Sequence, residues 1–283
     1  MKRSYFFASG ICLLIVLGGA WFVRASIRDL VYQTSQPVLP PPIAYQATST
    51  DAFMRVPTST GRGEPMRSPS DRGQAIKPGQ THGSAPTTTK KFPSQVNLAI
   101  PFLLQAPTHK WIQPYEDACE EASAIMVDAY YRGRTEKYGE QEGDKVILDL
   151  IAYENGLFGK YESTSATETA RLIENYFPNR RVTVHAPTST QEIKQLVAQN
   201  IPVIVPLYGK ALNNPYFRNG GPIYHMLVVK GYLPDGRFIT NDPGIGRGAD
   251  YIYAADVLWE AMHDWNEGDV LNGKPMILIV RPK

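Results

Sequence analysis

Cysteine is scarce in this sequence, and neither sign of charge is in strong excess. The chain has two cysteines in 283 residues, and its 29 basic and 27 acidic residues give a formal net charge of +2. Cys12 lies in an apolar N-terminal run, so Cys119 has no cysteine partner in the rest of the chain, which argues against an intramolecular disulfide. Because the basic residues are mixed with acidic ones, we expect no nucleic-acid partner.

Histidines at metal-ligand spacing are also lacking. His109, His185 and His263 show no ligand-like spacing with one another or with a pair of cysteines. Zinc sites in proteins are built from histidines and cysteines at short, regular spacings. The sequence therefore predicts no metal and no other cofactor.

The N-terminus carries a long apolar run at residues 5–23, preceded by Lys2 and Arg3. As a helix this run would measure roughly 28 Å, close to the ~30 Å hydrocarbon core of a bilayer. The positive charges in front predict a cytoplasmic N-terminus and export of the following chain. A loose cleavage site before Ser26 leaves a signal peptide as the alternative. Residues 1–31 are therefore predicted to be a membrane anchor or a signal peptide, with the remainder extracytoplasmic.

Residues 32–95 are rich in proline, serine, threonine, glycine and glutamine, and few apolar residues recur at a regular period. This composition predicts a disordered linker. A flexible chain of roughly 60 residues has an end-to-end distance of about 45 Å, so a domain beyond it could work away from a membrane surface.

Residues 96–283 have the periodicity of a folded α+β domain, with helices in its first half and strands in its second. The expected strands cover residues 96–104, 181–185, 202–207, 223–232, 237–241, 251–253 and 276–280. The expected helices begin near residues 117, 146, 165, 189 and 256, and those at 165 and 189 carry capping boxes.

Cys119 lies in the first turn of the first expected helix. Asp117 and Glu120 have the spacing of a capping box, and Ala122 and Met126 belong to one apolar helical face. Free backbone N–H groups and the helix dipole lower the pKa of a cysteine in such a position. Because the thiolate is the reactive form, Cys119 is the candidate nucleophile.

Cysteine catalysis also needs an imidazole, a group that orients the imidazole, and a donor for the oxyanion. A hairpin around the turn at residues 233–236 would bring His225 and Asp242 together. Asn241 is the rival orienting residue, and neighbouring strand residues point to opposite faces. Gln105, upstream of the thiol at an expected strand end, can supply the oxyanion donor.

Each of these residues also has a purely structural interpretation. A single cysteine on a helix is often a small core residue, and His225 could be a satisfied core histidine. Asp242 could serve the turn that its Pro-Gly sequence favours. Trp111 and Tyr208 could line a cleft or fill the core. The order of a glutamine, a capped cysteine, a histidine and an aspartate along one chain favours catalysis.

The segments around these residues resemble the papain-like cysteine peptidases of family C thirty-nine, in the stand-alone form. The resemblance covers residues 96–280, and its motifs lie at residues 100–107, 118–126, 225–232 and 241–244. It implies a papain-like fold in which the helix carrying the nucleophile packs on an antiparallel sheet. It also implies these roles: Cys119 nucleophile, His225 acid and base, Asp242 orienting residue, Gln105 oxyanion donor.

The expected function is therefore that of an exported or membrane-tethered cysteine peptidase that hydrolyses peptide bonds. A transglutaminase or amidase would use the same four residues, and a catalytically inactive module could use the cleft to grip peptide or cell-wall polymer. The expected partners are a peptide or protein substrate and, through the N-terminal helix, a membrane. The sequence leaves the oligomeric state open.

Overall fold

The computed structural model describes residues 27, 30, 32–47 and 92–283. The apolar run predicted to be an anchor or signal peptide lies outside these residues, as does most of the predicted linker. Across the described residues, no helix has both the length and the apolar character needed to cross a membrane. The chain divides into two units, residues 1–40 and 41–283. Within the first unit, residues 32–35 form a helical turn.

The second unit is built on a seven-stranded antiparallel sheet. Six strands lie in the order β2-β7-β3-β4-β5-β6, and β1 pairs with β4 beside this path. The strands are β1 (Val96–Asn97), β2 (Arg180–His185), β3 (Val203–Leu207), β4 (His225–Tyr232), β5 (Phe238–Asn241), β6 (Tyr251–Tyr253) and β7 (Ile277–Pro282). Every residue of β3, β4 and β5 is buried, so these strands form the centre of the hydrophobic core.

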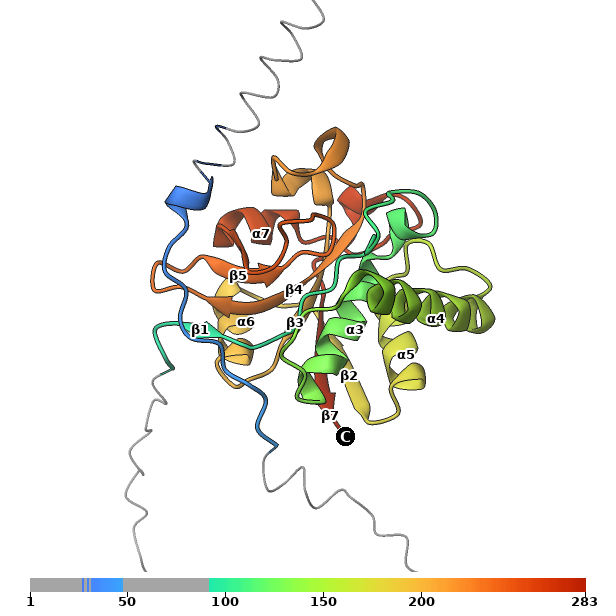
Figure 1. Ribbon diagram of the computed structural model, residues 1–283, viewed down its shortest axis with the longest axis horizontal. Helices are drawn as coiled ribbons and strands as arrows, with labels where there is room; N and C mark the ends of the chain where they lie inside the picture. Colours follow the sequence, from blue (N-terminus) through green and yellow to red (C-terminus); the bar gives the residue numbers. More distant parts are fainter. Residues whose placement is uncertain (1–26, 28–29, 31, 48–91) are drawn as a thin grey trace, which may run out of the picture. The chain divides into compact units, whose positions relative to one another are not determined.

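Helices cover this sheet, with α3, α4 and α5 grouped on one side of β3 and β4 in Figure 1 and α6 and α7 on the other. The helices are α3 (Cys119–Tyr131), α4 (Glu140–Phe158), α5 (Ala166–Tyr176), α6 (Thr190–Val197) and α7 (Ala255–Ala261). Short 3-10 turns are η1 (Tyr115–Asp117), η2 (Gly209–Leu212), η3 (Arg218–Gly220) and η4 (Val270–Asn272). The predicted α+β class is confirmed.

The helix that begins at Cys119 differs from its prediction in two ways. Its N-cap is Ala118, without a side-chain hydrogen bond, because Asp117 belongs to the preceding turn η1; the predicted capping box is therefore wrong. All thirteen residues of α3 are buried, not one face alone. The buried carboxyl group of Asp128 forms an ion pair of 2.8 Å with Arg180 of β2, which offsets the cost of burying its charge. The sequence predicted one buried face, whereas the sheet and the helices α4 and α5 enclose α3 on all sides.

The alternating residues 96–104 form a strand only at Val96–Asn97, so the longer predicted strand is wrong. Leu98, Ile100 and Leu104 are buried, so the alternation reflects burial in the core. Pro101 has no backbone N–H to donate to a sheet, and the chain beyond Leu98 is irregular.

The other two predicted capping boxes have different outcomes. The box of Ser165 with Glu168 at the start of α5 is present. At α6 the side chain of Ser189 makes no capping hydrogen bond, and Glu192 instead accepts from the backbone N–H of Thr188 at 3.0 Å. Glu192 is held there because its other oxygen contacts His185.

One segment of the predicted linker contacts the folded unit. Ile43 forms a parallel bridge with Leu98, through backbone hydrogen bonds of 2.7 and 2.8 Å. Tyr45 packs edge-on against Tyr130 and Tyr131 at the end of α3, with ring centroids 5.6 and 4.9 Å apart. The packed unit therefore includes a short piece of chain well before Val96.

Candidate active site

The β4–β5 hairpin brings His225 and Asp242 together. Val228 pairs with Asn241, so Asp242, one residue further, lies opposite Leu227. Side chains two apart on a strand share a face, and His225 is two residues before Leu227. His225 Nε2 lies 2.8 Å from Asp242 Oδ1, and both side chains are buried. Since Nε2 is engaged, Nδ1 is the imidazole nitrogen left to face the cleft.

Asp242 accepts three hydrogen bonds at once. Oδ1 receives the imidazole and also the backbone N–H of Gly244 at 2.9 Å, and Oδ2 receives the hydroxyl of Tyr253 at 2.6 Å. A Cβ at position 244 would lie 2.8 Å from His225 Cε1, so glycine permits this close approach. The carboxylate is thus fixed from both sides, and its orientation fixes the imidazole.

Tyr253 and Asn214 extend this chain of hydrogen bonds, and neither residue was predicted from the sequence to belong to the site. Asn214 Nδ2 donates to the Tyr253 hydroxyl at 2.6 Å. Burial, followed by the nearby Asp242, holds the pKa of Tyr253 well above its usual value, so this hydroxyl remains a donor. No local sequence signal marks the two residues, because only the fold brings them to the hairpin.

Asn241, the rival orienting residue, points away from the imidazole. Its Nδ2 donates to the carbonyl oxygens of Ile100 and Pro101 at 3.1 and 3.4 Å. Because side chains alternate along the strand, Asn241 faces the irregular segment after β1, whereas Asp242 faces His225.

Cys119 begins α3 on the opposite wall, and its backbone N–H is among those that have no partner within a helix. Its Sγ accepts from the backbone N–H of Met226 at 3.4 Å, next to His225. The thiol also lies 2.9 Å from Glu120 Oε2 and is only 4% exposed. Burial, then the charge of Glu120, raises the pKa of Cys119 well above its usual value. The expected lowering by the helix N-terminus is therefore outweighed.

Gln105 lies in an irregular segment beside Cys119, not at the end of a strand. Its Nε2 donates to the carbonyl oxygens of Tyr115 and Glu116, at 2.9 and 3.0 Å. Its backbone N–H donates to Pro243 O at 3.0 Å, which ties this segment to the Asp242 loop. In this arrangement Gln105 fixes the turn that leads into the nucleophile helix.

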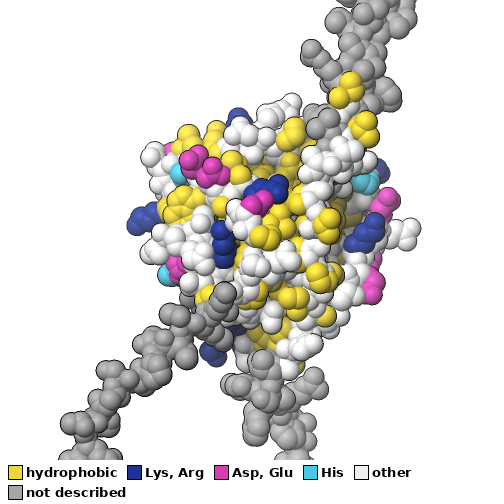
Figure 2. Space-filling view, turned by 90° about the vertical axis from the view of Figure 1, so that its left-hand side faces the viewer, with side chains coloured by type: hydrophobic (Ala, Val, Ile, Leu, Met, Phe, Trp, Pro, Cys, Tyr) yellow, Lys and Arg dark blue, Asp and Glu magenta, His cyan; other side chains and the backbone are white. Residues whose placement is uncertain are grey.

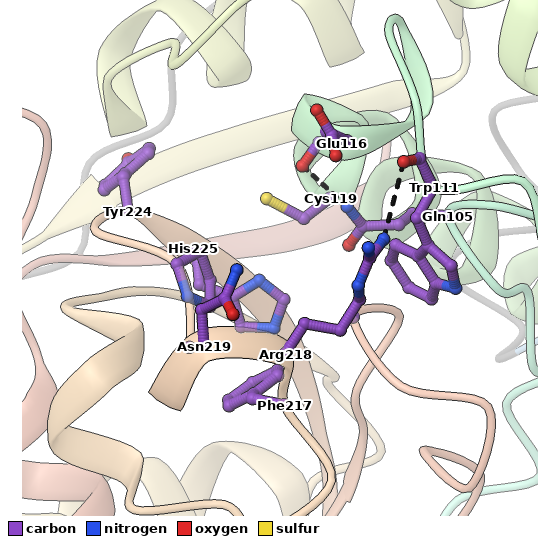
Figure 3. A pocket seen from close by; sticks show the side chains of 12 residues that line it. Gln105, Trp111, Glu116, Cys119, Phe217, Arg218, Asn219, Tyr224 and His225 are labelled. Carbon is purple, nitrogen blue, oxygen red and sulfur yellow. Dashed lines mark hydrogen bonds between the residues drawn. The ribbon is translucent and has the colours of Figure 1, made fainter. Parts of the chain in front are cut away.

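A cleft of about 250 Å³ runs between these walls. Its lining includes Gln105, Cys119, His225 and Trp111, and Figure 3 shows Cys119 and His225 projecting from opposite elements. Tyr208, the other aromatic considered for the cleft, is not part of its lining. The remaining lining residues are Glu116, Phe217, Arg218, Asn219, Gly221, Pro222, Tyr224 and Gly244. The cleft can take a few side chains of an extended peptide.

Charge around the folded part is mixed. The face in Figure 2 shows basic and acidic side chains scattered among apolar and neutral ones. The described part of the chain contains no group of three or more His, Cys, Asp or Glu residues arranged to hold a metal ion. The lining of the cleft supplies a thiol from Cys119, an imidazole from His225 and a carboxyl group from Glu116.

Comparison with known proteins adds a family assignment. The model of the Peptidase_C39-like family matches residues 97–267. A crystal structure of a C39-like peptidase from Bacillus anthracis is similar at 17% identity and a TM-score of 0.43, covering 67% of this chain and 99% of that one. A mutant fragment of prointerpain A from Prevotella intermedia is similar at 14% identity and a TM-score of 0.41, covering 68% and 73%. No curated protein matches the sequence.

The family match extends from β1 to beyond α7, and it includes the cysteine, the histidine and the aspartate described above. The chain therefore belongs to the Peptidase_C39-like family.

Proposed function

We propose that this protein hydrolyses peptide bonds with Cys119 as the nucleophile and His225 and Asp242 as its partners. The observation that carries the proposal is the buried 2.8 Å contact between His225 and Asp242 at the cleft that Cys119 also lines. A carboxylate held in this way fixes the tautomer of the imidazole and stabilises its protonated form.

The reaction begins when the thiol proton passes to His225 Nδ1 and the thiolate attacks the peptide carbonyl carbon. The backbone N–H of Cys119 faces the developing oxyanion, and Gln105 adds a second donor when one amide hydrogen leaves its loop carbonyl. His225 then protonates the leaving amine. Water, deprotonated by His225, attacks the thioester, releases the new carboxyl terminus and restores the thiol.

Alkylation by iodoacetamide at pH 6 tests this nucleophile in the full-length chain. Cys119 is expected to react about tenfold or more faster than free cysteine, because His225 Nδ1 can take the thiol proton as the sulfur attacks, whereas free cysteine has no such base beside it. Peptide mapping by mass spectrometry separates the label on Cys119 from that on Cys12. Reaction at or below the rate of free cysteine would contradict the proposal.

A catalytically silent peptide-binding module is the second candidate. The observation that favours it is the thiol itself, which is 4% exposed and lies 2.9 Å from a carboxyl oxygen. Such a module would bind peptides without alkylation of Cys119 at pH 6. The same alkylation experiment therefore separates the two functions.

The apolar run at residues 5–23 and the two basic residues before it support export of the catalytic domain. The protein then acts outside the cytoplasm, tethered by this run or released after cleavage. Protease added to intact cells is expected to degrade the domain. A domain that is digested only after cell lysis would contradict export.

A further inference from the structure

Three carboxyl groups lie together behind the thiol of Cys119. Glu120 and Glu121 belong to α3 and Glu154 to α4, and each is at most 1% exposed. Glu121 and Glu154 act on one another, and no ion pair to a Lys, Arg or His joins either carboxyl group within the described residues. A buried carboxylate without a counter-charge is strongly unfavourable, so such groups tend to keep their protons. Burial raises the pKa of Glu120 to about 8 and that of Glu154 to about 7.

The side chain of Glu120 is aimed at the sulfur. Oε1 accepts the backbone N–H of Thr164 at 3.2 Å, and Oε2 lies 2.9 Å from Cys119 Sγ. Thr164 is itself fixed, because the hydroxyl of Tyr224 donates to its carbonyl oxygen at 3.0 Å. The carboxyl group therefore has one defined orientation, with its second oxygen against the thiol.

The surroundings of Glu120 contain acids rather than cations. The titratable groups that act on it are Cys119 and Glu121 on its own helix, Glu154 from α4, Asp117 from η1 and Tyr224 next to β4. Lys160 pairs with Glu168 of α5 at 3.4 Å and acts on Glu154. No cation pairs with the carboxyl group of Glu120 among the described residues. An ionised Glu120 would consequently face a thiolate and other acids without a counter-charge.

The protonation of Glu120 decides what it does to Cys119. At 2.9 Å a carboxylate and a thiolate repel one another, so an ionised Glu120 keeps the thiol protonated. A protonated Glu120 has the opposite effect, because its O–H can donate to the thiolate, and a hydrogen bond to an ionised acceptor is a strong one.

We propose that Glu120 is a positioning residue that acts as a neutral acid: its Oε2–H donates a hydrogen bond to the Cys119 thiolate while His225 Nδ1 holds the proton taken from sulfur. This inference rests on the proposed function, since it requires Cys119 to be the nucleophile. The proton of Glu120 stays on Oε2 throughout, so no atom is gained or lost.

Ionisation of Glu120 is then expected to lower the reaction rate as the pH rises. Above about pH 8 Glu120 becomes a carboxylate, and the thiolate–imidazolium pair reverts to a neutral thiol and a neutral imidazole. Replacement by glutamine keeps a neutral donor at every pH, so it is expected to remove this fall. Methionine has a similar length and no donor, so it is expected to slow the reaction about tenfold below pH 7.

The test is the rate of Cys119 alkylation by iodoacetamide in the full-length chain between pH 5 and pH 9, followed by peptide mapping. The wild type is expected to lose rate between about pH 7.5 and 9, whereas Glu120→Gln does not. Glu154→Gln is expected to shift the fall to lower pH, because removal of the Glu154 charge eases ionisation of Glu120. Glu162→Gln, an exposed site two residues before Thr164, is the matched control and should reproduce the wild-type profile.

Thermal unfolding gives a readout that does not depend on the reaction. A carboxyl group whose pKa is raised by folding loses stability as pH rises from about 4.5 towards 8, so the unfolding temperature should fall less in Glu120→Gln over this range. An identical alkaline fall of the alkylation rate in wild type and Glu120→Gln overturns the role of Glu120 alone. A Cys119 that is not alkylated at any pH in any variant overturns the proposed function.

Discussion

Replacement of His225 by alanine is expected to lower kcat/KM for a peptide substrate by about 100- to 10,000-fold, the usual contribution of a positioned general acid and base. The variant loses the group that takes the thiol proton and protonates the leaving amine. It also loses the cation that holds the thiolate, so alkylation of Cys119 at pH 6 should slow with it. Steady-state kinetics and alkylation rates, measured on the same preparation, check both effects.

The matched control for this variant is His185→Ala. His185 is a partly exposed histidine in contact with Glu192, and it is not among the residues that line the cleft. Its replacement should leave kcat/KM unchanged within about twofold, because exposed ion pairs contribute little. Equal losses in the two histidine variants would contradict the assignment of His225.

Replacement of Asp242 by alanine is expected to lower both stability and turnover. Its three donors, from His225, Gly244 and Tyr253, would lose their acceptor in a buried site. A buried donor left without an acceptor costs about 1–3 kcal/mol, so the unfolding temperature should drop by several degrees. The imidazole would also lose its orientation, and kcat/KM should fall about 100-fold or more.

Two further variants separate stability from orientation. Asp242→Asn keeps an acceptor for His225 and should recover most of the stability. Asp235→Ala, in the exposed turn of the same hairpin, removes a surface pair with Arg237 and should change neither quantity appreciably. A stable Asp242→Ala variant with undiminished turnover would contradict the orienting role.

The features that were predicted correctly from the sequence are set by residues close to one another along the chain. The turn at residues 233–236 sets the hairpin register, and Leu233 N–H indeed donates to Arg237 O at 2.9 Å. That register alone would place Asp242 opposite Val228, and a bulge between Val229 and Gly231 shifts the pairing by one residue, which puts Asp242 on the face of His225. The capping box of Ser165 is equally local, since a serine and a glutamate three residues apart meet at a helix start wherever the helix lies.

The predictions that were wrong concern features that depend on burial in the folded structure. Apolar alternation at residues 96–104 resembles a strand, yet those side chains are buried by packing while the backbone is irregular. The pKa of Cys119 was expected to be lowered by its helix position, but burial and Glu120 raise it. Neither the carboxyl cluster behind the thiol nor the contact of Tyr253 with Asp242 can be seen in a sequence, because α4 and β6 reach these places only in the fold.

The raised pKa of Cys119 means that the reactivity of the thiol depends on the groups around it. A buried thiol beside a carboxylate is inert, whereas the same thiol beside a protonated Glu120 and His225 has a donor on one side and a base on the other. Burial of Glu120 therefore keeps the cysteine usable near neutral pH. The reactive state depends on the environment of two groups, not on the helix N-terminus alone.

Peptide cleavage in water enriched in ¹⁸O tests the central claim most directly. The full-length protein is incubated with a peptide library, and the products are analysed by mass spectrometry beside a Cys119→Ser control. We predict new carboxyl termini that each carry one ¹⁸O atom from the water that resolves the thioester, and no products from the serine variant. Products formed equally by the serine variant, or only amine-crosslinked peptides without ¹⁸O, would contradict a Cys119-dependent hydrolase.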